Sequence, residues 1–277
     1  MDDTALHHCM TDLQRDQFDQ QGYLIVEDAL DAETLDRIEE AGDRVDARER
    51  EARGLGAEAM MAKFRTIVED DAFLELLDWP KTFPLIWDIL GWNVQHYISH
   101  LIYYPPEQDC ESTEKVGGWH QDGGRPVPEM ERPQPRLSLK IAYWLSDTGA
   151  PDRGGIRIIP GSHKRDYPPD RHPEDEFEDE MQVRVKAGTA VLFDRRLWHA
   201  RGMNTSDVTR KVLFLGYSYR WLRPRDNVTV AHIWNGLDPI RQQLLGASAN
   251  GGFGYTSPKD EDVPLKLWME EHLGEVV

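Results

Sequence analysis

Cysteine is almost absent from this chain of 277 residues, which contains only Cys9 and Cys110. Two cysteines so far apart form neither a CxxC motif nor a disulfide framework, and this fits a reducing cytoplasm. No stretch approaches the ~20 apolar residues that a transmembrane helix needs. The first residues also lack a basic patch followed by an apolar run, so no signal peptide is expected. We therefore expect a cytoplasmic protein that does not enter a membrane.

Positive charge is scarce as well. The chain has 32 Lys and Arg against 50 Asp and Glu, and its net charge is −18 at pH 7. A surface of that sign repels phosphate backbones, so nucleic acid is not expected as a partner. Apolar residues still make up 39% of the chain, which is the balance of a globular protein rather than a disordered one.

Two kinds of pattern divide the chain near residue 92. Before it, apolar residues recur at helical spacing. After it come short β-branched or aromatic runs broken by Gly, Pro and Asp, which is typical of a sandwich or barrel. We expect a single domain over 1–277, made of a helical part at about 1–92, a β core at about 93–225 and a C-terminal extension at 226–277.

Local signals predict individual elements. Thr11 and Gln14 have the spacing of a helix capping box, and residues 23–26 are expected to form a strand. Gly91 is a suitable C-terminal cap for the helix before it. Residues 172–181 carry six carboxylates in ten positions. That run is interpreted either as a solvated loop or as a flap over a pocket.

The segment GGWHQDGGR, residues 117–125, carries the first chemical signal. On an extended strand, His120 and Asp122 point to the same face and can bind one metal ion. A third ligand has to come from elsewhere, and His199 in FDRRLWHARGMN is the candidate. Two histidines and one carboxylate on one face form the facial triad of non-haem Fe(II) oxygenases, which leaves coordination positions open.

Arg210 follows His199 by eleven residues, in TSDVTRKVLFLGYSYRW. It shares a strand face with Val212 and Phe214, so its side chain is expected to point into a cavity. A guanidinium there can form a two-pronged pair with a carboxylate. The alternative is an ordinary surface or edge charge, although both faces of this strand are apolar or aromatic.

The order of these motifs resembles the phytanoyl-CoA dioxygenase-like branch of the Fe(II)/2-oxoglutarate oxygenases. The HxD motif is followed by RGGIRIIPGSHK and then by AGTAVLFDRRLWHARGMNTSDVTR. The resemblance covers roughly residues 12–225. It implies a mainly β protein with helices: a double-stranded β-helix (jelly roll, cupin-like) with N-terminal helices packed on one sheet. It also implies a dioxygenase that uses Fe(II), 2-oxoglutarate and O₂, hydroxylates a small molecule, and releases succinate and CO₂.

The same resemblance implies roles for individual residues. His120, Asp122 and His199 would be the iron ligands, and Arg210 would hold the distal carboxylate of 2-oxoglutarate. Trp144 falls where the family often lines the co-substrate pocket, although a core aromatic is an equal alternative. Two positions of the implied 2-oxoglutarate site depart from the family pattern: Arg201 replaces a small hydroxyl residue, and Tyr104 replaces a basic residue before a Pro-Pro turn. Tyr104 is the candidate for a secondary contact to 2-oxoglutarate.

An aspartate in the HxD motif has a further implication, because the halogenating relatives have Ala or Gly there. Asp122 therefore favours hydroxylation or another oxidative outcome. Three basic residues are candidates for binding the substrate: Lys140, Arg125 and Arg201. Lys140 has an alternative as a gatekeeper on an edge strand. The acidic composition disfavours a CoA ester, whose phosphates need a basic rim, so a small polar or amphipathic metabolite is expected.

Two other classes of function remain open at this point. One is a cupin-type hydrolase or isomerase with Zn²⁺ or Mn²⁺ at the same ligands. The other is a jelly roll that binds a metabolite without catalysis. A buried Arg210 would disfavour the first class, and an intact triad disfavours the second. The sequence predicts neither the identity of the substrate nor the oligomeric state.

Overall fold

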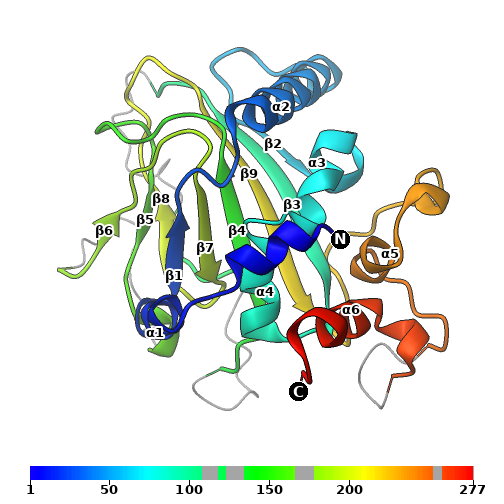
Figure 1. The fold of residues 1–277 in the computed structure, drawn as a ribbon. Coiled ribbons are helices and arrows are strands. Elements are labelled where there is room, and N and C mark those ends of the chain that lie inside the picture. Colours follow the sequence, from blue (N-terminus) through cyan, green and yellow to red (C-terminus); the bar gives the residue numbers. More distant parts are fainter. Residues whose placement is uncertain (108–117, 123–133, 166–177, 252–257, 277) are drawn as a thin grey trace.

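Two antiparallel β-sheets form the centre of the protein, and helices cover the outer face of the larger one (Figure 1). The computed structural model describes residues 1–107, 118–122, 134–165, 178–251 and 258–276. The strands are β1 Tyr23–Val26, β2 Met61–Phe64, β3 Val94–Tyr104, β4 Ser138–Trp144, β5 Ile156–Ile158, β6 Met181–Gln182, β7 Ala190–Asp194, β8 His199–Arg201 and β9 Arg210–Tyr219. The helices are α1 Asp12–Gln21, α2 Ala32–Arg53, α3 Asp71–Glu75, α4 Phe83–Leu90, α5 Pro239–Leu244 and α6 Pro264–Leu273.

The six-stranded sheet has the order β1-β7-β4-β9-β3-β2, and the three-stranded sheet has the order β6-β5-β8. Every strand pair is antiparallel. This is the predicted jelly roll with helices on one sheet, and the predicted fold is confirmed. None of the helices in the described part of the chain has both the length and the hydrophobicity that crossing a bilayer requires.

Alternation along β4 shows how the two faces of the large sheet differ. Leu139, Ile141 and Tyr143 belong to the core under the helices. Ala142 and Trp144 belong to a second core, which the facing sheet completes. Because successive side chains of a strand point to opposite faces, the even-numbered residues of β4 line the space between the sheets.

The local signals of the N-terminal part correspond to the observed elements. Thr11 and Gln14 form the capping box of α1, with both reciprocal hydrogen bonds. Ile38 and Val45 are buried on the apolar face of α2. Helix α4 ends at the predicted residue, where Gly91 has φ +78°. Packing of these faces against the sheet, more than intrinsic propensity, stabilises such helices.

Gly22 connects α1 to β1 in the left-handed conformation, with φ +83°. A Cβ at this position would lie 2.4 Å from Nδ1 of His163, so the ring packs directly on the backbone. His163 also contacts the carbonyl oxygen of Asp19 through Nε2, at 3.2 Å. These contacts give His163 a structural role at the junction of α1 and β1.

The acidic run at residues 172–181 is only partly within the described chain. Residues 172–177 lie outside the described residues, so the prediction of a flap is not tested. The last members of the run form ion pairs: Asp179 with Arg165, at 2.8 Å, and Glu180 with Arg157, at 2.6 Å.

Candidate metal centre and co-substrate pocket

The segment with His120 and Asp122 is held against β8 and the loop before it. The backbone of His120 exchanges two hydrogen bonds of 3.0 Å with that of His199, and the amide of Asp122 donates to the carbonyl of Arg195 at 2.8 Å. This is an isolated bridge rather than the regular strand expected from the sequence. The pairing still brings the imidazole rings of His120 and His199 to a centroid separation of 4.3 Å.

Three potential metal ligands meet at this point. One ligand atom each from His120, Asp122 and His199 lies within 4.8 Å of the other two. In the described ranges, this is the only group of three or more His, Cys, Asp or Glu side chains close enough to share a metal ion. Two imidazoles and one carboxylate are the donor set of the non-haem Fe(II) facial triad.

Backbone carbonyls orient both imidazoles. The Nδ1 atoms of His120 and His199 lie 2.8 Å from the carbonyl oxygens of Gly118 and Leu197, respectively. A proton on Nδ1 satisfies each of these contacts and leaves the lone pair of Nε2 for a metal ion. The donor set therefore fits a divalent cation without any rearrangement of the rings.

The charge states at neutral pH also suit metal binding. Burial lowers the pKa of His199 to about 4, although the nearby Asp122 carboxylate opposes this, so the imidazole is neutral at pH 7. Burial alone would raise the pKa of Asp122. The charges of Lys140 and Arg195 and the hydrogen bond from Lys140 outweigh that effect, and the pKa of Asp122 lies well below its usual range. An ionised carboxylate is therefore available beside the neutral imidazole of His199.

Lys140 reaches this centre from the middle of the large sheet. Strand β4 lies between β7 and β9, so the alternative of a gatekeeper on an edge strand is wrong. The Nζ atom of Lys140 donates to Oδ2 of Asp122 at 2.9 Å and lies 4.6 Å from the ring centroid of Phe214. The side chain is buried, with its charge compensated by the triad carboxylate.

Arg210 is buried at the start of β9, which excludes the alternative of a surface charge. Its guanidinium carbon lies 4.9 Å from the ring centroid of Trp144 and 5.4 Å from that of Tyr104. The buried Nε of Arg210 and Nε1 of Trp144 have no hydrogen-bond partner among the residues that the structure describes. Burial lowers the pKa of Arg210 to about 10, so the side chain remains charged at neutral pH. A buried cation beside unsatisfied donors is the arrangement that a bound carboxylate would complete.

Three further residues were expected from the sequence to contact the substrate or the co-substrate: Arg201, Tyr104 and Arg125. Arg201 is paired with Glu107, with Nη2 at 2.9 Å from Oε1, and its guanidinium stacks on Tyr104 at 4.4 Å. The ring of Tyr104 therefore lies near two guanidinium groups, those of Arg201 and Arg210. Arg125 lies outside the described residues.

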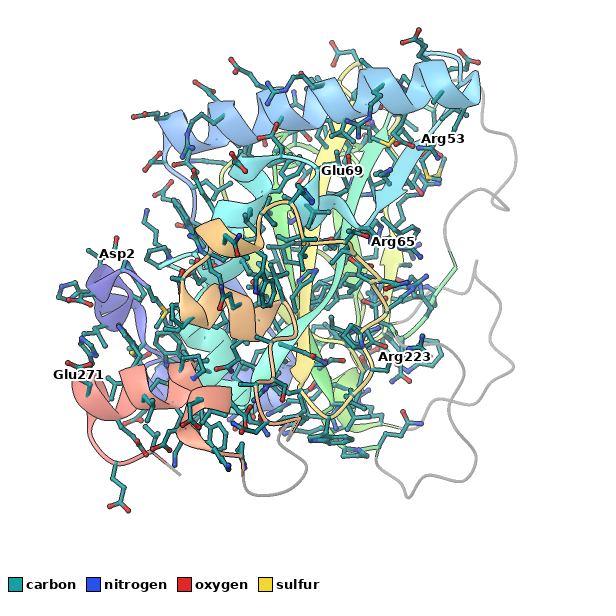
Figure 2. All side chains as sticks on the ribbon, turned by 90° about the vertical axis from the view of Figure 1, so that its right-hand side faces the viewer. Asp2, Arg53, Arg65, Glu69, Arg223 and Glu271 are labelled. Atoms are coloured by element: carbon teal, nitrogen blue, oxygen red, sulfur yellow. The ribbon has the colours of Figure 1, made fainter. Side chains whose placement is uncertain are left out.

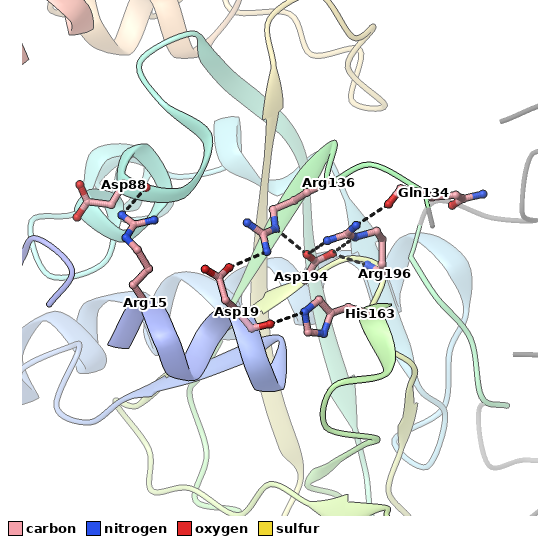
Figure 3. Close-up of polar contacts among 8 residues, drawn as sticks. All are labelled: Arg15, Asp19, Asp88, Gln134, Arg136, His163, Asp194 and Arg196. Carbon is pink, nitrogen blue, oxygen red and sulfur yellow. Dashed lines mark hydrogen bonds and ion pairs between the residues drawn. The ribbon is translucent and has the colours of Figure 1, made fainter. Parts of the chain in front are cut away.

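A buried ionic network holds the loop between β7 and β8 (Figure 3). The carboxylate of Asp194 accepts hydrogen bonds from Arg136, at 2.8 Å, and from Arg196, at 2.7 Å. Arg136 also contacts the Asp19 side chain on α1, at 3.2 Å. The backbone amide of Leu197 donates to the Asp194 carbonyl at 2.8 Å. The network thus fixes the loop that leads into His199.

The sequence did not predict a role for the residues that lead from β7 to His199. Three consecutive residues, Asp194, Arg195 and Arg196, are charged and yet poorly exposed. Period-two alternation after Val191 and Phe193 would have placed Arg195 between the sheets. Glu107, the partner of Arg201, had no local signal.

A separate pocket of about 620 Å³ opens on the side of the molecule that faces the viewer in Figure 2, where Arg65 and Glu69 are labelled. Its wall includes Phe64, whose ring lies 4.6 Å from that of His100. His100 stacks in turn on Phe214, at 5.0 Å. None of the three potential metal ligands lines this pocket. It is therefore a neighbour of the centre and not the centre itself.

Comparison with known proteins connects this geometry to a family. The family model described as phytanoyl-CoA dioxygenase (PhyH) matches residues 18–212. An uncharacterized protein of Mycobacterium tuberculosis is 29% identical over 201 residues, which is 68% of each chain. The ectoine dioxygenase of Nocardia farcinica is 24% identical over 239 residues, 73% of this chain and 75% of the relative.

A solved structure with a similar fold is HygX from Streptomyces hygroscopicus, with nickel and 2-oxoglutarate bound. Its TM-score is 0.65 at 15% identity, covering 78% of this chain and 90% of HygX. HygX has also been crystallised with iron bound.

Proposed function

Because this chain belongs to the phytanoyl-CoA dioxygenase family, it is a non-haem iron- and 2-oxoglutarate-dependent dioxygenase, and we propose that it hydroxylates a small polar or amphipathic metabolite. The proposal includes the residues that do this. His120, Asp122 and His199 hold the iron, and Arg210 holds the distal carboxylate of 2-oxoglutarate. O₂ is the second co-substrate, and succinate and CO₂ are the products released.

The observation that carries the proposal is the occurrence of two features between the two sheets. One is the set of three metal-ligand atoms within 4.8 Å of one another. The other is the buried guanidinium of Arg210, which has no carboxylate partner among the described residues. A hydrolase with zinc or manganese at the same ligands has no use for that cation, and a jelly roll that only binds a metabolite has no use for the triad.

Each protein group has a defined task in this scheme. When bound, iron supplies the oxidising chemistry together with O₂ and 2-oxoglutarate. The carbonyls of Gly118 and Leu197 keep the two imidazoles in the tautomer that binds metal. Asp122 supplies the negative charge, and Arg210 anchors the co-substrate at a fixed distance from the triad. A carboxylate at Asp122 also occupies the position that a halide would need, which favours hydroxylation.

The substrate class follows from charge. The chain carries a net charge of −18, and Arg165, one of the basic residues near the acidic run, is paired with Asp179. A CoA ester would need several unpaired basic residues at the pocket rim. We therefore favour a substrate without the CoA group, despite the name of the family.

The test is reconstitution of the full chain with Fe(II) under anaerobic conditions. The native protein should bind equimolar iron, develop the visible charge-transfer band of chelated 2-oxoglutarate, and form succinate after O₂ is admitted. His199→Ala should lose all three properties, whereas His232→Ala, which changes an exposed histidine, should keep them. Succinate formation by a variant lacking both His120 and His199 at the native rate would overturn the proposed ligand set.

A further inference from the structure

Arg195 is a buried cation to which the proposed chemistry assigns neither iron nor 2-oxoglutarate, although its charge helps to lower the pKa of Asp122. It directly follows β7, whose Val191 and Phe193 face the second sheet. Alternation places the Arg195 side chain on that same inner face. Only 6% of the residue is exposed. Burial of a guanidinium is costly unless a negative or polar partner compensates for it.

The contacts of Arg195 compensate for only part of its charge. Its Nη1 donates to Oγ of Ser138 at 3.0 Å, and its guanidinium carbon lies 4.6 Å above the ring of Tyr97. In the described part of the chain, the buried Nε atom has no hydrogen-bond partner. Among the described residues, no side-chain carboxylate forms an ion pair with Arg195.

The neighbouring arginine shows what a structural role looks like in this loop. Arg196 binds the buried Asp194 through Nε and Nη2, and the carbonyl of Gln134 through Nη1 (Figure 3). Arg195 differs because its guanidinium group donates to Ser138, outside this network, on the face of the large sheet that is turned toward the second sheet.

Arg195 and Arg210 lie at opposite ends of the inner face of β4. Arg210 stacks on Trp144, at the last residue of the strand, and Arg195 binds Ser138, at the first. Six residues of strand separate the two contact points, which corresponds to about 20 Å. Lys140 lies between them and contacts the triad carboxylate of Asp122. The proposed metal centre is thus flanked by two buried guanidinium groups.

We propose that Arg195, together with Ser138 and Tyr97, binds a carboxylate group of the primary substrate. This inference rests on the proposed function, in which Arg210 is already assigned to 2-oxoglutarate. A guanidinium fork matches a carboxylate in a two-pronged pair, the Ser138 hydroxyl adds a further donor, and the Tyr97 ring holds the guanidinium plane. The substrate is then a carboxylic acid whose anion lies on the Ser138 side of the triad.

The experiment uses a matched set of compounds because the natural substrate is not known. The probes are monocarboxylic acids with linear and aromatic skeletons, each paired with its own primary amide. Their binding to the full chain, loaded with Zn²⁺ and 2-oxoglutarate, is measured by ligand-detected NMR. The readout is the ratio of acid affinity to amide affinity for one skeleton, which does not depend on the fraction of folded protein.

Native protein should prefer at least one acid over its amide by tenfold or more. In Arg195→Gln the preference should disappear, whereas Arg195→Lys, which keeps the charge but not the fork, should retain part of it. Ser138→Ala should reduce the ratio by a smaller factor. Arg223→Gln removes the same charge from an exposed position and should leave the ratio unchanged.

Equal binding of acids and amides by the native protein would overturn the inference, and so would an acid preference that survives in Arg195→Gln. Failure of the proposed function has a different signature. In that case the native chain with Fe(II) would not form the charge-transfer band with 2-oxoglutarate, whatever its preference among the probes.

Discussion

The ammonium group of Lys140 lies 2.9 Å from Oδ2 of Asp122, and both side chains are largely shielded from solvent. The same oxygen lies 3.9 Å from Nε2 of His199, which is the atom that would bind the metal. The lysine therefore fixes the orientation of the carboxylate relative to the imidazole. It approaches from the centre of a sheet, where its own position is fixed by Phe193 and Phe214.

Replacement of Lys140 by methionine should weaken metal binding. Methionine keeps much of the volume but removes the hydrogen bond that orients Asp122, and loss of such a partner typically costs about 10–100-fold in metal affinity. Competition with a chelator of known affinity measures the change. Lys266→Met, on the distant helix α6, is the control. An unchanged or tighter affinity would show that Lys140 does not position the carboxylate.

Replacement of Arg210 should affect the co-substrate selectively. Arg210→Gln removes one charge-assisted pair from a buried site, at a cost on the order of 2–5 kcal/mol. That corresponds to an increase of about 30-fold or more in the KM for 2-oxoglutarate. Succinate formation over a range of 2-oxoglutarate concentrations tests this, with Arg223→Gln as the exposed control. An unchanged KM would assign the role to another basic residue.

Two glycines with positive φ allow a matched test of packing. Gly22 and Gly54 have φ of +83° and +62°, but a Cβ would contact His163 only at Gly22, and nothing lies within 4 Å at Gly54. Gly54→Ala should cost about 1 kcal/mol from backbone strain alone. Gly22→Ala should cost about 3 kcal/mol because the clash adds to the strain. Denaturant unfolding of both variants measures the difference. Equal losses would mean that the His163 ring moves aside freely.

Asp194 should make the stability of the protein depend on pH. Burial opposes its ionisation, but the hydrogen bonds and charges of Arg196 and Arg136 prevail and lower its pKa. Ionised Asp194 therefore stabilises the folded chain fully at pH values above the pKa of this carboxyl in the unfolded chain, which is about 4. The stabilisation is lost as the pH falls below that value and through the lower pKa of the folded chain.

Asp194→Asn should therefore lose about 3 kcal/mol at pH 7. This loss should shrink once the pH falls below about 4, because the carboxylate of the unfolded chain then binds a proton while that of the folded chain is still ionised. Unfolding of both proteins in urea at pH 7 and at pH 3 measures it. Asp147→Asn, which breaks an exposed pair with Arg153, should change stability by less than about 1 kcal/mol at either pH. A loss at pH 3 as large as that at pH 7 would contradict the assignment.

The elements that the sequence predicted correctly are those with a strong local pattern. The capping box at Thr11 and the strand at residues 23–26 depend on near neighbours and were found at the expected positions. The meeting of His120, Asp122 and His199 was also expected, because three residues of the right type occurred in a known order. In that case a resemblance supplied the long-range information that spacing alone does not contain.

The features that the sequence did not predict depend on contacts between distant segments. Glu107 neutralises Arg201 across a separation of 94 residues, and no periodicity signals such a pair. Lys140 had two interpretations until the strand order placed β4 inside the sheet. Arg195 was passed over because a charged residue beside a strand usually faces solvent.

The pairing of β1 with β7 has a consequence for synthesis of the chain. Tyr23 pairs with Phe193, and 170 residues separate them. At about 5–20 residues per second, a ribosome needs on the order of 10–30 s to supply the second strand after the first. During that interval β1 has no strand to pair with, and the apolar Leu24, which is buried in the finished fold, has not yet reached its core. A nascent chain of this protein is therefore most exposed to aggregation or to chaperone capture before β7 emerges.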